Sequence, residues 1–88
     1  MKREEVKQII AESRRAFGQL NLPNENELRG MIDVWEEVFA DISYAHAHKA
    51  VIMLTRESDK SLTAAQIYRA AKQIARDEYL ANGGIIYG

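Results

Sequence analysis

An apolar stripe at helical spacing surrounds Trp35, the only tryptophan of the chain. Apolar side chains recur at intervals of three and four residues, at Met31, Ile32, Trp35, Val38, Phe39 and Ile42. This spacing places them on one face of an α-helix, which has to be buried against other elements. Because a tryptophan can bury about 150–250 Å², we expect it to anchor the core. The expected core anchors are Trp35, Phe39, Val51, Leu54 and Ile67.

Helical periodicity and capping signals divide the chain into four helices, at about 2–17, 24–40, 44–56 and 64–81. No stretch alternates with a period of two residues over the length of a strand, so the sequence predicts an all-α fold. We expect a compact four-helix bundle, in which short connections make sequential helices roughly antiparallel.

Polar residues with capping chemistry stand before three of these helices. Asn24 followed by Glu27 has the spacing of a capping box, and Asp41 or Ser43 can cap the third helix. The strongest local signal is Thr63-Ala64-Ala65-Gln66, a second capping box before the fourth helix.

The length of 88 residues indicates one domain, which we place at residues 1–82, with a short tail at 83–88. The chain has no cysteine, which suits a reducing cytoplasm. Its longest clean apolar run, residues 50–54, is far too short to span a bilayer, so we expect no membrane association. The sequence does not indicate an oligomeric state.

Few residues of the chain are arranged for catalysis or metal binding. His46 and His48 are two residues apart on a helix, so they point about 200° apart and cannot share a metal ion. Glu36 and Glu37 are adjacent and cannot converge on one reacting atom. There is also no cysteine and no glycine-rich phosphate loop after a strand. We therefore expect a protein that is not an enzyme and that uses no cofactor.

Charge is distributed unevenly along the chain, although the formal net charge is only −1. Six acidic side chains and one basic one lie between residues 25 and 41, whereas four basic and no acidic ones lie between 60 and 76. These runs either solubilise the protein or pair with each other, or one of them docks a partner of opposite charge. The candidate partner-binding residues are Asp33, Glu36 and Glu37 on the acidic helix and Arg69, Lys72 and Arg76 on one face of the basic helix.

The C-terminal tail is a further candidate, because Ile85, Ile86 and Tyr87 follow two glycines. These side chains either fold back onto the core or are offered to a partner. Tyr68, Ile74 and Tyr79 suggest base stacking, but the spacing of the three does not fit one exposed face, and we expect Ile74 in the core. The near-neutral balance argues against a dedicated DNA-backbone binder, although the basic face keeps a small DNA-binding regulator as an alternative.

Several of these patterns together resemble the small phage helicase loader/inhibitor proteins, which are all-helical replication proteins. The similarity covers about residues 4 to 75 and consists of Glu4-Glu5-Val6, Trp35 with Val38 and Phe39, Asp41 with Tyr44, Ala47 with Ala50, and Leu62-Thr63-Ala64-Ala65-Gln66-Ile67. The chain departs from the family at Phe17-Gly18 and at Ser61-Leu62, where members usually carry Tyr-Pro and a pair of prolines. Members also often have a longer C-terminal extension, for which the tail from Gly83 would stand in.

The resemblance implies a non-enzymatic adaptor in phage DNA replication, acting in the cytoplasm of the host bacterium. Such a protein would bind the hexameric replicative helicase, or its loader or initiator, and control its loading. Whether it loads or inhibits the helicase stays open. A phage protein that captures another host factor is a further alternative.

Overall fold

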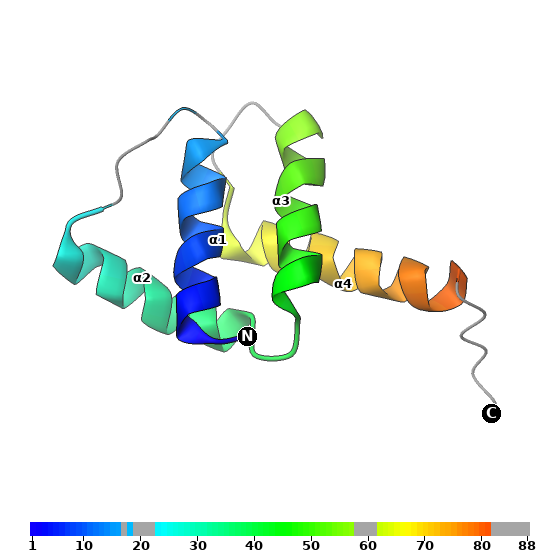
Figure 1. Cartoon of the computed structure of the whole chain (residues 1–88), viewed down its shortest axis with the longest axis horizontal. Helices are drawn as coiled ribbons and strands as arrows, with labels where there is room; N and C mark the ends of the chain where they lie inside the picture. Colours follow the sequence, from blue (N-terminus) through cyan, green and yellow to red (C-terminus); the bar gives the residue numbers. More distant parts are fainter. Residues whose placement is uncertain (17, 19–22, 58–61, 82–88) are drawn as a thin grey trace.

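A computed structural model of the chain describes residues 1–16, 18, 23–57 and 62–81. These residues form four α-helices and no strand. The helices are α1 (Arg3–Arg15), α2 (Glu25–Val38), α3 (Tyr44–Glu57) and α4 (Ala64–Ala81) (Figure 1). The prediction of an all-α fold with four helices is confirmed.

The capping residues begin the helices at the positions that the sequence indicates. The Asn24 side chain accepts a hydrogen bond from the Glu27 amide at 2.9 Å, and Ser43 accepts one from the amide three residues on at 3.2 Å. Thr63 and Gln66 form the reciprocal pair of a capping box, with distances of 2.9 and 3.2 Å. These bonds satisfy amides that the first helical turn leaves unpaired.

Two helices end earlier than the apolar pattern predicts. α1 stops at Arg15, and Gly18 follows with a φ of +77°, a conformation that favours glycine. α2 stops at Val38 because the chain tightens there: the Ala40 amide donates to the carbonyl of Glu37, three residues back rather than four. The apolar periodicity continues through such a turn, so it overestimates the length of the helix.

The helices cross instead of forming an antiparallel series (Figure 1). α1 and α3 lie side by side with their N-terminal ends at the same end of the molecule, while α2 and α4 run across them. α1 and α4 each approach both α2 and α3, whereas α2 and α3 do not approach each other. The expected compact bundle of four helices is confirmed, and two sequential pairs, α1 with α2 and α3 with α4, are neighbours; the members of each pair cross where a roughly antiparallel arrangement was expected.

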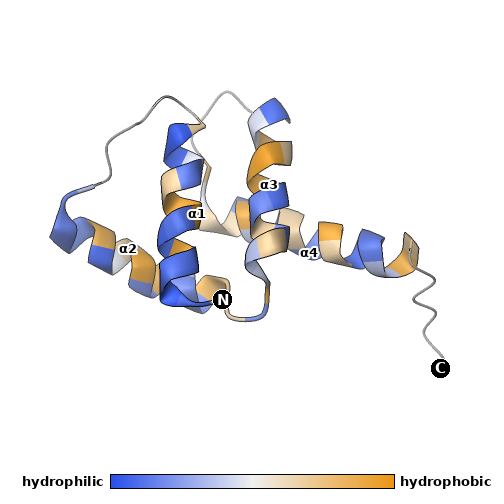
Figure 2. Ribbon diagram, in the orientation of Figure 1, coloured by the Kyte–Doolittle hydropathy of each residue, from blue (hydrophilic) through white to orange (hydrophobic). Residues whose placement is uncertain are grey.

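The core lies where the four helices face one another. Along each helix, hydrophilic and apolar residues alternate in the manner of helices with one buried face (Figure 2). The largest fully buried side chains are Phe39, Ile9, Ile10, Ile67 and Val6. Small buried residues on α3 and α4, including Ala47, Ala50 and Ala71, allow these two helices to approach closely.

Trp35 is not the centre of this core. Of the five expected anchors, Phe39, Val51 and Ile67 are buried, but Trp35 and Leu54 are only partly buried and pack against the core from its edge. The Trp35 ring meets the Phe39 ring edge-to-face, with centroids 5.6 Å apart and planes at 76°. Both aromatic side chains lie on one helix face. Phe39, which directly follows the last residue of α2, is the more deeply buried of the two.

Candidate functional site

The acidic surface of α2 is partly neutralised by α1. The Arg3 guanidinium donates to Asp33 at 2.8 Å and to Glu36 at 3.2 Å, and both carboxylates raise the pKa of Arg3, Asp33 more strongly. These side chains are exposed enough for water to screen them, so the pairs contribute little to stability. The exposed Glu37 carboxylate makes no ion pair within the part of the chain that the structure describes. Two of the three acidic candidates are thus already engaged.

The basic candidates lie together on α4, as their spacing predicts. Arg69, Lys72 and Arg76 are all exposed. Lys72 pairs with Asp41 at 3.1 Å, whereas neither Arg69 nor Arg76 forms an ion pair among residues 1–16, 18, 23–57 and 62–81. The acidic and basic runs of the sequence therefore meet at one point, and two guanidinium groups of the basic face remain available.

Asp41, in the turn after α2, connects that turn to α4. Its carboxylate accepts hydrogen bonds from Lys72 at 3.1 Å and from the Tyr68 hydroxyl at 3.0 Å. Lys72, then Tyr68, lowers the pKa of Asp41, and the carboxylate raises the pKa of both partners. The Lys72 ammonium also lies 6.0 Å from the centre of the Tyr68 ring. These contacts fix the positions of Tyr68 and Lys72.

A shallow hollow of about 600 Å³ lies along this face of α4. We call it the α4 groove and define it by six side chains, Tyr68, Arg69, Lys72, Gln73, Arg76 and Tyr79. Tyr68 and Tyr79 are not predicted as a pair, because together with Ile74, which packs against the core, they fit no single helix face. Taken alone they are eleven residues apart, which places them within about 20° of each other around a helix. That spacing was the available signal.

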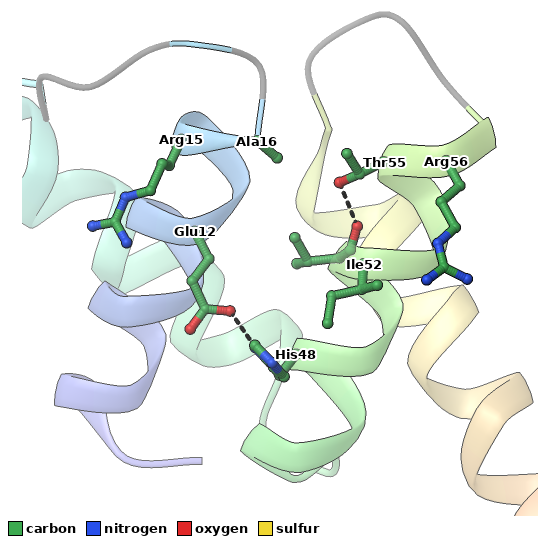
Figure 3. Close-up of a pocket in the computed structure, with 8 residues that line it drawn as sticks. Glu12, Arg15, Ala16, His48, Ile52, Thr55 and Arg56 are labelled. Carbon is green, nitrogen blue, oxygen red and sulfur yellow. Dashed lines mark hydrogen bonds and ion pairs between the residues drawn. The ribbon is translucent and has the colours of Figure 1, made fainter.

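A second hollow, of about 360 Å³, lies between α1 and α3 (Figure 3). Val51 and Ile52 contribute apolar wall, and the Thr55 hydroxyl is occupied by the carbonyl of Val51 at 2.6 Å. Arg15 and Arg56 extend to opposite sides, away from the gap between the two helices (Figure 3). Among the described residues, the hollow therefore has no charged group directed into it from its upper rim.

At the lower end of this hollow, Glu12 joins α1 to α3. One carboxylate oxygen contacts His48 Nδ1 at 2.6 Å, and the other accepts a hydrogen bond from the Tyr44 hydroxyl. The Tyr44 and His48 rings stack with centroids 5.8 Å apart. The hydrogen bond to Glu12 raises the pKa of Tyr44 to about 12. These contacts join the two helices.

The two histidines of α3 contact different helices, in agreement with their predicted opposite directions. His46 Nε2 lies 3.0 Å from Glu78 on α4, which also contacts Lys49, whereas His48 contacts Glu12 on α1. Lys49, then His46, lowers the pKa of Glu78. Across the described ranges, no three histidine, aspartate or glutamate side chains are grouped to hold a metal ion.

Ile85, Ile86 and Tyr87 lie outside the described residues, as does the whole predicted tail at 83–88. None of the four helices has both the length and the apolar character needed to cross a bilayer. Comparisons of the chain with protein families, with curated proteins and with solved structures found no match.

Proposed function

We propose that this protein is a non-enzymatic adaptor in phage DNA replication that binds the hexameric replicative helicase and controls its loading. The proposal starts from the resemblance to phage helicase loader/inhibitor proteins, which spans about residues 4 to 75. The observation that supports it most directly is the role that the resembling residues have in the fold.

Several of the residues that carry the resemblance form joints, by which we mean side-chain contacts that connect two helices. Asp41 connects the end of α2 to α4 through Tyr68 and Lys72. Tyr44, three residues later, connects the start of α3 to α1 through Glu12. One short Asp-x-x-Tyr motif therefore contributes to two contacts, α2 with α4 and α3 with α1, which together involve all four helices. A motif with this role determines how the helices are arranged. Its presence in this chain is therefore an argument that the chain has the same helix arrangement as the family it resembles.

Two further resembling segments have similar roles. Trp35 and Phe39 form the edge-to-face pair at the core. The segment from Leu62 to Ile67 begins α4 with its capping box and places both of its terminal side chains in the core. The resemblance thus lies in residues that pack or cap the helices. The exposed residues would determine which partner binds.

An adaptor of this kind needs exposed surface for a partner and different affinities for two states of that partner. The candidate surfaces are the charged faces of α2 and α4, with the exposed side chains of Val34, Tyr79 and Leu80 beside them. Large exposed apolar side chains next to charged ones are typical of protein interfaces.

The proposal is tested by mixing the purified protein with a purified hexameric replicative helicase from a host bacterium or its phage. Size-exclusion chromatography with light scattering should show co-elution, and the protein alone should hydrolyse no ATP. A monomeric helicase of another class serves as the control and should elute separately. Separate elution from the hexameric helicase, its loader and the initiator would refute the proposal.

A further inference from the structure

The α4 groove combines positive charge with exposed aromatic surface. Its lining includes three basic side chains and no acidic one. Arg69 and Arg76 have no ion-pair partner in the described part of the chain, and seven residues of helix place them about 10 Å apart along the axis. Both guanidinium groups can therefore bind carboxylates of a partner that are separated by a similar distance.

One end of the groove is already ordered before a partner arrives. Asp41 holds both Tyr68 and Lys72 by hydrogen bonds of 3.0 and 3.1 Å, from outside the groove. A surface whose side chains are fixed in advance loses less conformational entropy on binding. Tyr68 and Lys72 are thus held by hydrogen bonds to Asp41, beside Arg69 and Arg76.

The other end of the groove is apolar and exposed. Tyr79, which lines this end, is 51% exposed. Tyrosine and arginine are among the residues that most often dominate the binding energy of protein interfaces. The groove contains both types on one helix face.

We infer that the α4 groove docks an acidic segment of the partner protein, with carboxylates on Arg69 and Arg76 and an apolar side chain against Tyr79. This inference rests on the proposed adaptor function and names the surface that it uses. A nucleic-acid backbone is a poorer occupant, because its affinity depends on many phosphate contacts and only two cations here are unpaired among the described residues.

The test measures binding of the fluorescently labelled full chain to the hexameric replicative helicase by anisotropy. The double variant Arg69→Glu/Arg76→Glu reverses both free charges of the groove. The control, Lys7→Glu/Arg15→Glu, makes the same change in net charge at exposed positions of α1. Circular dichroism checks that both variants are folded. A parallel titration with oligothymidylate measures binding to single-stranded DNA.

We expect the groove variant to bind the helicase at least about tenfold more weakly and the control to stay within about twofold of the wild type. Equal binding by wild type and groove variant would overturn the inference and leave the adaptor function intact. Equal losses in both variants would also overturn it, because net charge rather than the groove would be responsible. Wild-type protein that does not bind helicase, loader or initiator would refute the adaptor function, and the inference with it. Oligothymidylate binding as tight as helicase binding, and lost in the groove variant, would assign the groove to nucleic acid.

Discussion

Replacing Phe39 with alanine should destabilise this protein much more than replacing Trp35 with alanine. Phe39 is fully buried and is the largest of the fully buried side chains. Trp35 is larger, but it lies at the edge of the core and already contacts water. The two rings touch each other, so the comparison separates depth of burial from aromatic character.

The magnitudes follow from burial. Truncating a buried phenylalanine costs about 3–5 kcal/mol, and losing the edge-to-face contact adds about 0.5–1.5 kcal/mol. A domain of 88 residues has a free energy of unfolding of about 4–13 kcal/mol, so Phe39→Ala removes a large share of it. For Trp35, which is only partly buried and loses the same edge-to-face contact, we expect a smaller total loss of about 1–3 kcal/mol.

Urea unfolding followed by far-UV circular dichroism measures both values, because this signal does not depend on the tryptophan. Phe39→Leu is the matched control, since it keeps an apolar side chain at the site and should lose less than Phe39→Ala. If Trp35→Ala costs as much as Phe39→Ala, or more, the assignment of Phe39 to the centre of the core is wrong.

Three further predictions concern joints and caps. Thr63→Ala should lower the free energy of unfolding by about 1 kcal/mol, measured by urea titration, whereas Thr63→Ser should retain most of the stability; equal losses would contradict the capping role. The raised pKa of Tyr44, about 12, favours the neutral phenol in the folded state, so its stabilisation is complete below pH 10, its ordinary pKa, and is lost as pH rises toward 12. Melting temperatures over that range should therefore fall less in Tyr44→Phe than in the wild type, and identical curves would contradict the Glu12 contact. The lowered pKa values of Asp41 and Glu78 favour the ionised forms, so their stabilisation is present above the ordinary values of 3.8 and 4.5 and is lost as pH falls below them. The stability difference between wild type and Asp41→Asn should shrink over that acidic range, and a constant difference would exclude an ionic role for Asp41.

Local features of the fold could be predicted from the sequence because they depend on neighbouring residues. Asn24 and the pair Thr63 and Gln66 are capping residues by type and spacing, and α4 begins and ends where the pattern predicts. Depth within the core could not be predicted. Trp35 and Phe39 are one turn apart on the same face, and periodicity identifies the face without ranking its members.

The joints depend on contacts between residues far apart in sequence. Glu12 and Tyr44 are separated by 32 positions, and Asp41 and Lys72 by 31. No local pattern pairs them, so the helix crossings that they fix could not be foreseen either. The α4 groove lies between these cases. The spacing of its basic residues predicts one shared face, whereas its two tyrosines are aligned only when Ile74, which packs against the core, is left out of the set.

The central proposal is that the protein binds the replicative helicase through the α4 groove. Hydrogen–deuterium exchange of the full chain, with and without saturating hexameric replicative helicase, is the most direct test, because one experiment reports both binding and its location. We expect the backbone amides of α4 between Tyr68 and Tyr79 to exchange more slowly when the helicase is bound, and those of α1 to be unchanged. Protection confined to α2, or no change anywhere in the chain, would contradict the proposal.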